Sequence, residues 1–217
     1  MACVLCSGSS LSEVSSIDAK TSEPLRVCVC EACGMVQQDP IPTEDELQIY
    51  YSHNYRIDYK QAYSPRPKHV LRAGNNALGR LAFLRQAGIS SGSLLDVGAG
   101  GGEFVYLAGK AGFDARGVEP NIGYSEYAQV EYGSQIQTGQ LSDVDGCVDL
   151  ITMFHVLEHL PSPLAAFERL YEHCADAGHV FIEVPWIETP RASPHNIFFR
   201  AHLHYFGVAT LAACASR

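Results

Sequence analysis

The stretch LLDVGAGGGEF, residues 94–104, decides the fold of this chain. An apolar strand pattern leads into a loop with glycine at alternate positions, and an apolar helix pattern follows. Glycine allows positive φ angles and lets the backbone come close to a ligand. A strand that enters a glycine loop before a helix is typical of a nucleotide-like ligand site in an α/β domain.

Strand and helix patterns alternate on both sides of this loop. We predict strands over 94–97, 114–118, 135–138, 148–153 and 179–184, and helices over 68–87, 102–111, 123–131 and 162–174. The segments DLITMF and HVFIEV are apolar on both faces, which is typical of parallel strands covered by helices. The sequence therefore predicts a doubly wound, mostly parallel α/β sheet.

The spacing of the glycines distinguishes between two cofactors. The dinucleotide fingerprint G-x-G-x-x-G, started at Gly98, requires glycine where this chain has Glu103. S-adenosylmethionine carries an amino-acid group instead of a phosphate, and Asp96 can meet its ammonium directly or through water. Glu119, in GVEPN, can accept hydrogen bonds from the ribose hydroxyls. Dinucleotide sites also bind ribose through an acidic residue at this position, so Glu119 alone does not distinguish the two cofactors. The loop therefore favours S-adenosylmethionine.

LLDVGAGGGEF and GVEP resemble motif I and the second acidic motif of the class I S-adenosylmethionine-dependent methyltransferases, and FHVLEHL resembles the segment after their fourth strand. The resemblance covers roughly residues 75–210 and implies a Rossmann-like methyltransferase core. The cofactor-binding residues that it implies are Asp96, Gly98, Ala99, Gly100, Gly102, Glu119, Pro120, Gln140, Leu141, Phe154 and His155.

The same resemblance implies a role for each group of residues. The glycines would line the methionine part, and Glu119 would hold the ribose. Gln140 and Leu141 would flank the adenine, while Phe154 and His155 would close over the sulfonium.

Two C-x2-C pairs, CVLC and CEAC, lie near the N-terminus. Their thiolates, from Cys3, Cys6, Cys30 and Cys33, can complete the tetrahedral shell of one structural Zn²⁺. Cys28 is an alternative ligand, and ordinary buried cysteines or a redox pair are the competing interpretations. Zinc is favoured because about 35 residues bury too little apolar surface to fold unaided.

The string CEACGMVQQDPIPTEDELQIYYSHNY resembles the N-terminal zinc module of a bacterial methyltransferase subfamily that includes enzymes acting on carbon of deoxysugar nucleotides. We predict a zinc-ribbon-like module over 1–37, a connector over 38–67 and the methyltransferase core over 68–217. The connector should hold a short helix over 44–51, capped by Thr43 with Glu46. Its tyrosines, Tyr50, Tyr51 and Tyr55, would cover the acceptor pocket or pack within the connector.

Methyl transfer to oxygen or carbon needs a base for the acceptor's proton, and histidine suits that work. The candidates are His155, His159, His195, His202 and His204, each of which could equally be a surface or core histidine. FFRAHLHYFG, residues 198–207, follows the fifth predicted strand at the ligand-binding end of the sheet.

FFRAHLHYFG resembles the subfamily's Y-x-E-H segment, but Phe199 and Ala201 replace its tyrosine and glutamate. Only His202 is retained. We therefore expect O-methylation, with His202 as the base and His204 or His159 assisting.

The chain ends soon after the fifth strand of the predicted sheet. The resemblance implies a sixth and a seventh strand, and the 33 residues after Val184 leave no room for them. We expect a fragment, truncated at its C-terminus, that keeps cofactor binding and can lack activity. HVFIEV would then be an apolar edge strand through which the chain self-associates.

Composition narrows the partners. A formal charge of -9 without a basic cluster disfavours nucleic acid, and the sequence has no apolar stretch long enough for a bilayer. The first residues lack a secretion signal, so we expect a cytoplasmic location. The leading hypothesis is a methyltransferase for a small acceptor such as a sugar or a sugar-containing metabolite. The alternatives are an RNA methyltransferase and a non-catalytic binding or scaffold protein.

Overall fold

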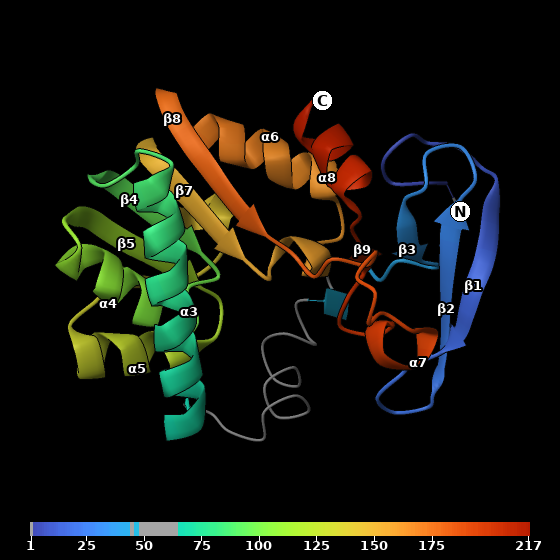
Figure 1. Cartoon of the computed structure of the whole chain (residues 1–217), viewed down its shortest axis with the longest axis horizontal. Coiled ribbons are helices and arrows are strands. Elements are labelled where there is room, and N and C mark those ends of the chain that lie inside the picture. Colours follow the sequence, from blue (N-terminus) through green and yellow to red (C-terminus); the bar gives the residue numbers. More distant parts are fainter. Residues whose placement is uncertain (1, 44–45, 48–64) are drawn as a thin grey trace. The chain divides into compact units, whose positions relative to one another are not determined.

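The computed structural model describes residues 2–43, 46–47 and 65–217, except for the side chains of 194–195 (Figure 1). The chain divides into two compact units. Unit 1 comprises Met1–Leu47, His155–Glu168 and Ile182–Arg217, and unit 2 comprises Gln48–Phe154 and Arg169–Phe181. Three separate segments of sequence therefore build unit 1.

Unit 2 contains the predicted parallel sheet, apart from the last two residues of β8. Its strands are β4 (Gly92–Val97), β5 (Phe113–Glu119), β6 (Gln135–Thr138), β7 (Val148–Phe154) and β8 (Cys174–Glu183). Their order is β6-β5-β4-β7-β8, and β4 pairs in parallel with both β5 and β7. The doubly wound sheet is confirmed, and only β8 differs clearly from its prediction because it begins directly after the preceding helix.

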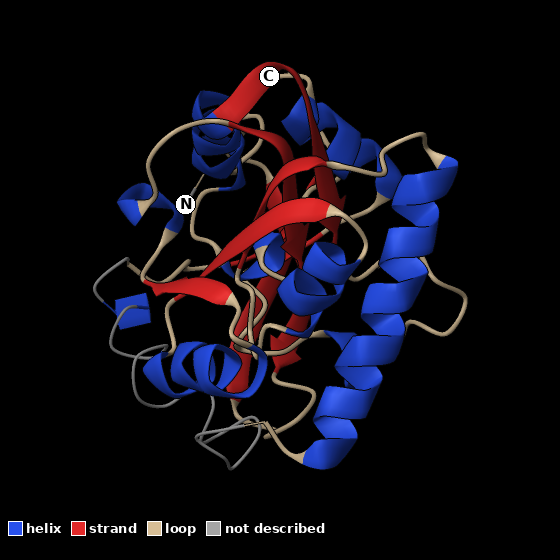
Figure 2. Cartoon of the chain, turned by 90° about the vertical axis from the view of Figure 1, so that its left-hand side faces the viewer, coloured by secondary structure: helices blue, strands red, loops and turns tan. Residues whose placement is uncertain are grey.

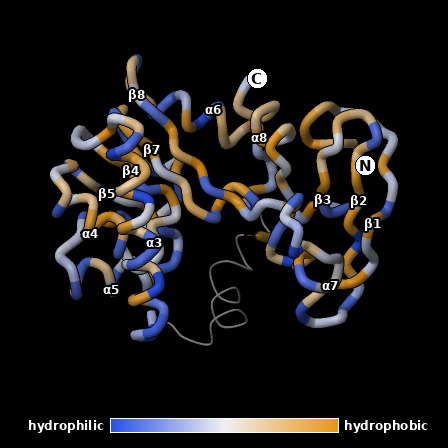
Figure 3. Tube along the Cα trace, viewed as in Figure 1, coloured by the Kyte–Doolittle hydropathy of each residue, from blue (hydrophilic) through white to orange (hydrophobic). Residues whose placement is uncertain are grey.

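The helices of this fold are α3 (Pro67–Gln86), α4 (Glu103–Lys110), α5 (Ile122–Tyr132) and α6 (Pro163–His173). Figure 2 shows α3 as the long helix beside the twisted strands. Apolar residues of α3, α4 and three strands form one buried cluster: Ala77, Leu81, Leu84, Leu94, Phe104, Ala108, Phe113 and Leu150. Figure 3 shows the same pattern, with hydrophobic stretches along the strands and alternation along α3. This apolar core holds the glycine loop in place.

Unit 1 contains a second, antiparallel sheet, whose individual strands the sequence did not predict. Its strands are β1 (Leu11–Ile17), β2 (Pro24–Cys30), β3 (Val36–Gln38) and β9 (His204–Tyr205), in that order. β9 pairs with β3, so that Tyr205 lies opposite Val36. The N-terminal sheet thus includes a C-terminal strand, which covers the edge of β3.

Short elements complete the described part of the chain. They are the 3-10 turns η2 (Leu141–Asp143) and η3 (Leu157–His159), and the helices α7 (Pro194–Ile197) and α8 (Val208–Ala215). The predicted capping box is present, since the Thr43 N–H donates to Glu46 at 2.8 Å and the Glu46 N–H donates to Thr43 Oγ1 at 3.3 Å. The rest of that predicted helix, and the tyrosines at 50, 51 and 55, lie outside the described residues.

Across the ranges that the structure describes, every helix is too short or too polar to cross a membrane.

Candidate functional site

The glycine loop joins β4 to α4 in unit 2. Gly98, Gly100 and Gly102 have φ angles of 74°, 57° and 82°, a region that other residues rarely adopt. A Cβ on Gly102 would lie 2.6 Å from the Cβ of Ala128 in α5, whereas a Cβ on Gly100 would meet no atom within 4 Å. Gly102 is therefore required for packing, while Gly100 leaves open space beside the loop backbone.

Glu119 connects the ends of β4 and β5. Its Oε2 accepts a hydrogen bond from the Gly100 N–H at 2.8 Å, and its Oε1 accepts one from the Asn121 N–H at 3.0 Å. The side chain is buried, yet each carboxylate oxygen has a second lone pair that can accept a ribose hydroxyl. Glu119 therefore shapes the loop and presents acceptors at the carboxyl end of the sheet.

Asp96 lies in β4, two residues before Gly98, and is buried beside Thr152 of β7. The Thr152 hydroxyl donates to Asp96 Oδ1 at 2.7 Å. Burial raises the pKa of Asp96 to about 7, although the Thr152 hydrogen bond and the charge of Arg80 oppose this shift. The sequence did not identify Thr152, which occupies a position within an apolar strand.

Most of the other residues assigned to the cofactor lie on the loops after β5, β6 and β7, and Phe154 is the last residue of β7. The Gly139 N–H donates to the Glu119 carbonyl at 3.1 Å, which brings the segment with Gln140 and Leu141 beside the end of β5. Phe154 packs edge-on against Phe104, with ring centroids 4.8 Å apart. The structure thus gathers the predicted loops of unit 2 at one end of its sheet.

His155 belongs to unit 1 and has the positive φ of 56° that is unusual for a residue other than glycine. Its Nε2 lies 2.9 Å from Glu183 Oε1, and its Nδ1 lies 3.5 Å from Glu158 Oε1. The predicted cofactor residue therefore stands between two carboxylates.

The four predicted cysteines converge in unit 1. Cys3 Sγ lies 3.5 Å from Cys33 Sγ, Cys6 Sγ lies 3.6 Å from Cys30 Sγ, and all four sulfurs lie within 4.8 Å of one another. Tetrahedral zinc with bonds of about 2.3 Å places its sulfurs about 3.8 Å apart, so these spacings fit a zinc shell. Cys28 is buried but is not part of the cluster, which removes the ambiguity of the sequence.

The two C-x2-C turns have the same backbone geometry. The Ser7 N–H donates to the Cys3 carbonyl at 2.9 Å, and the Gly34 N–H donates to the Cys30 carbonyl at 2.8 Å. Ser7 and Gly34 have φ angles of 60° and 76°. Burial opposes ionisation of Cys30, but the N–H groups of Ala32 and Cys33 outweigh it and lower its pKa to about 7. Thiolate is the form that binds metal.

The structure brings together two of the three predicted catalytic histidines. Glu158, His159 and His202 each place a ligand atom within 4.8 Å of the others, and the rings of the two histidines are 5.0 Å apart. Burial and the neighbouring His159 lower the pKa of His202 to about 4. Burial also raises the pKa of Glu158, but His155 and His159 reverse this and lower it.

His204, the third predicted catalytic residue, is sealed inside unit 1. It lies in β9 and is 1% exposed, and burial lowers its pKa to about 4. Its Nε2 faces the Pro161 carbonyl at 3.3 Å. A general base has to reach the proton that it removes, so His204 is a core residue in this arrangement. The side chain of His195 lies outside the described residues.

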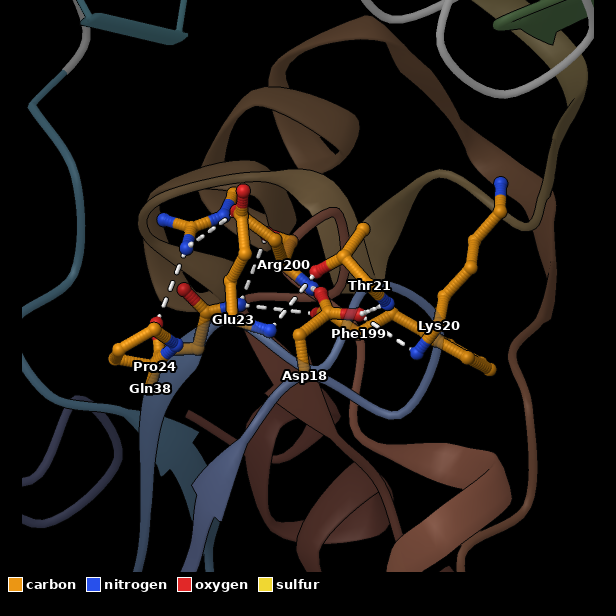
Figure 4. A network of polar contacts seen from close by, with 8 residues as sticks. All are labelled: Asp18, Lys20, Thr21, Glu23, Pro24, Gln38, Phe199 and Arg200. Atoms are coloured by element: carbon orange, nitrogen blue, oxygen red, sulfur yellow. Dashed lines mark hydrogen bonds and ion pairs between the residues drawn. The ribbon is translucent and has the colours of Figure 1, made fainter.

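A polar network fixes the turn at 199–202, which carries His202 (Figure 4). The Gln38 amide nitrogen lies 3.1, 2.9 and 2.8 Å from the carbonyl oxygens of Phe199, Arg200 and His202. Asp18 accepts a hydrogen bond from the Arg200 N–H at 2.6 Å. Sequence reasoning missed Glu158 and Gln38, and the only signal for Glu158 is an acid inside the apolar segment HVLEHL.

Comparison with known proteins agrees with this geometry. Residues 71–217 match a family model described as "Methyltransferase domain". The match covers well over half of the chain, which therefore belongs to this family of methyltransferase domains.

Individual relatives are distant. The ubiquinone biosynthesis O-methyltransferase of Pseudomonas paraeruginosa is 26% identical over 106 residues, which are 45% of this chain and 46% of that protein. The alignment thus spans about half of the relative's length. A solved structure from Thermotoga maritima, described as a possible histamine N-methyltransferase, has 15% identity and a TM-score of 0.51, covering 68% of this chain and 78% of that one.

A second solved structure is the magnesium protoporphyrin IX methyltransferase of Synechocystis with bound S-adenosylhomocysteine. It is 19% identical, with a TM-score of 0.49, and covers 61% of this chain and 68% of that one. The Thermotoga structure and the family match confirm the class I S-adenosylmethionine-dependent methyltransferase fold.

Proposed function

We propose that this protein is an S-adenosylmethionine-dependent methyltransferase that acts on a small-molecule acceptor. One observation carries the proposal: the left-handed glycine loop after β4 is hydrogen-bonded to the buried carboxylate of Glu119 at the end of β5. A loop of this kind leaves backbone groups open to a ligand, and the acid beside it suits ribose hydroxyls. The family match over residues 71–217 supports the same conclusion.

Bound S-adenosylmethionine would supply an already activated methyl group, so the chain's own task is to orient two molecules and to manage one proton. Gly98, Gly100 and Gly102 would border the methionine part, and Glu119 would accept the ribose hydroxyls. Gln140 and Leu141 would flank the adenine. Asp96, with its hydrogen bond from Thr152, would meet the ammonium directly or through water.

We propose that the acceptor is methylated on oxygen and is a sugar or a sugar-containing metabolite. The resemblance to the sugar-modifying subfamily supports the acceptor class. Phe199 and Ala201 lack the hydroxyl and carboxylate of the C-methylating pattern, which supports oxygen as the methylated atom. We assign removal of the acceptor's proton to the pair His159 and His202, either as a base or through a cation that they hold.

We also infer that Cys3, Cys6, Cys30 and Cys33 hold a structural Zn²⁺ in unit 1. The sulfur spacing and the matching C-x2-C turns support this assignment. Four thiolates leave no open coordination position, so such an ion would stabilise the antiparallel sheet and take no part in chemistry.

Calorimetric titration with S-adenosylhomocysteine tests the cofactor site. The wild type should bind, and Glu119→Gln should bind at least about 10-fold more weakly, because a hydrogen bond to a charged group contributes about 1.5–3 kcal/mol. Asp114→Asn is a matched control, since Asp114 lies on the same strand but is exposed. Absence of binding by the wild type, or equal affinity for Glu119→Gln, would contradict the proposal.

A further inference from the structure

We propose that Glu158, His159 and His202 form a binding site for a divalent transition-metal cation, separate from the four cysteines. The three residues offer one carboxylate oxygen and two imidazole nitrogens, all within 4.8 Å of one another. η3 supplies Glu158 and His159, and the turn before β9 supplies His202. All three residues belong to unit 1.

The buried carboxylate of Glu158 is approached only by histidine nitrogens at long distances among the described residues. Its side chain is 1% exposed, and neither oxygen has a hydrogen-bond partner among the described residues. Oε1 lies 3.5 Å from His155 Nδ1 and 3.9 Å from His159 Nε2. Burial of an ionised carboxylate without hydrogen bonds is unfavourable by several kcal/mol, and a cation placed between these groups offsets that cost.

The hydrogen bonding of His159 determines which of its nitrogens can bind a cation. His159 Nδ1 lies 2.5 Å from the Ala201 carbonyl oxygen, which has no hydrogen to donate, so Nδ1 carries the proton of this hydrogen bond. In the neutral ring Nε2 then carries a lone pair, and this nitrogen lies 3.9 Å from Glu158 Oε1. Metal-binding histidines usually donate their other ring N–H to a carbonyl or carboxylate in this manner.

The buried carboxylate needs a positive charge beside it, which is either a proton on His155 or His159 or a metal ion. The position of His202 favours the metal, because a proton satisfies two groups whereas a metal gathers three or more ligands. Gln38 and Asp18 hold the backbone of the turn that carries His202, and Ala201 in the same turn anchors His159. The ligand set is thus fixed by contacts that reach back to β3.

Two imidazoles and one carboxylate suit Zn²⁺ or a neighbouring first-row divalent ion, with a coordination position left for water or another oxygen ligand. Ligand atoms around tetrahedral zinc lie about 3.4 Å apart, so the side chains would close by roughly 1 Å on binding. A metal of this kind lowers the pKa of a bound oxygen ligand. Deprotonation of an acceptor hydroxyl by this route rests on the proposed O-methyltransferase function.

Equilibrium dialysis against ZnCl₂, followed by metal analysis, tests the site. Glu158→Gln and His202→Ala should each bind one zinc fewer per chain than the wild type. His179→Ala is the control for adventitious histidine binding, since His179 is exposed and outside the cluster, and it should match the wild type. Cys30→Ser should lose the zinc equivalent that the four cysteines hold. The double variant Cys30→Ser/Glu158→Gln should therefore bind two zinc equivalents fewer than the wild type.

Equal zinc content in wild type, Glu158→Gln and His202→Ala would overturn the proposal and would leave a protonated His155 or His159 as the partner of Glu158. Circular dichroism checks that each variant is folded, and His202, which is only partly buried, provides a second variant should Glu158→Gln fail to fold. Titration of the same variants with S-adenosylhomocysteine distinguishes a failure of the cation site from a failure of the methyltransferase proposal. Binding of S-adenosylhomocysteine measures the cofactor site, whereas zinc content measures the cation site.

Discussion

The parallel sheet of unit 2 and the antiparallel sheet of unit 1 are stabilised in different ways. In unit 2, Leu94 and Ile151 are fully buried, and their strands belong to a continuous apolar cluster with α3 and α4. In unit 1, β1 has the burial pattern of a surface strand, and one described cluster of buried apolar residues has five members, Leu25, Val27, Val36, Phe198 and Tyr205. Burial of apolar surface can hold the first sheet, and we expect a bound metal to help to hold the second.

The two units also carry different kinds of candidate site. The cofactor loop depends on backbone geometry, which a rigid apolar core preserves. The cysteines and the Glu158–His159–His202 cluster depend on side chains brought together from distant parts of the sequence, and metal binding can stabilise such an arrangement. Four changes can break or sharpen this comparison.

The largest effect should follow removal of one thiolate. Cys30→Ser should lose one equivalent of zinc and destabilise unit 1 by several kcal/mol, since structural zinc contributes about 10–16 kcal/mol in small domains. Metal analysis and thermal unfolding measure the two effects. Cys28→Ser is the matched control, because Cys28 is buried on the same strand outside the cluster. Zinc loss from both variants, or from neither, would refute the four-cysteine site.

Gly102→Ala tests the core of unit 2. The new Cβ would have to adopt a φ of 82° and would lie 2.6 Å from Ala128, so unfolding free energy should fall by about 2–4 kcal/mol. Gly79→Ala is the control, since Gly79 lies in α3 with no atom near its Cβ position. That variant should be unchanged or up to about 1 kcal/mol more stable in urea unfolding. Equal results for the two variants would show that the loop is not tightly packed.

Asp96 should make the stability of the ligand-free protein depend on pH. Its pKa is raised to about 7 from an ordinary value of 3.8, so the folded state retains a proton that the unfolded chain releases. Stability should therefore fall as pH rises from about 4 to about 7, by a few kcal/mol, and then level off. Asp96→Asn removes this titration, and urea unfolding of both proteins at pH 5 and pH 8 measures it. If the difference in unfolding free energy between the wild type and Asp96→Asn were the same at pH 5 and pH 8, that result would contradict the raised pKa.

The smallest effect concerns the edge of the parallel sheet. β8 is the terminal strand in the sheet order, and Val180 on it is 39% exposed. We expect weak self-association that is visible by size-exclusion chromatography at high concentration and is abolished by Val180→Lys. Elution of the wild type as a monomer at all concentrations would contradict this prediction.

The parallel sheet could be predicted because its signals are local. Each strand is a short apolar run with a helix close behind it, and the strand over Gln135–Thr138 was predicted at its observed bounds. The strand β8 was predicted too short, since Cys174 to Gly178 carry no apolar alternation and extend the strand only through pairing within the sheet.

The antiparallel sheet could not be predicted because it depends on pairing between distant segments. β9 has two residues and no strand pattern of its own, and it becomes a strand only by pairing with Val36 and Gln37. For the candidate site, residue types and spacing predicted roles for Glu119 and the four cysteines, and these remain predictions. They could not identify Glu158, whose significance lies in its burial beside His159 and His202.

Hydrogen exchange measured by mass spectrometry, with and without S-adenosylhomocysteine, tests the central claim most directly. The ligand should slow exchange of amides in the loop 98–102 and at 119–121, where the Gly100 and Asn121 N–H groups meet Glu119. Strands β1 to β3 should show no comparable change. Unaltered exchange in the loop, or protection confined to the cysteine-rich sheet, would contradict the assignment of the cofactor to the glycine loop of unit 2.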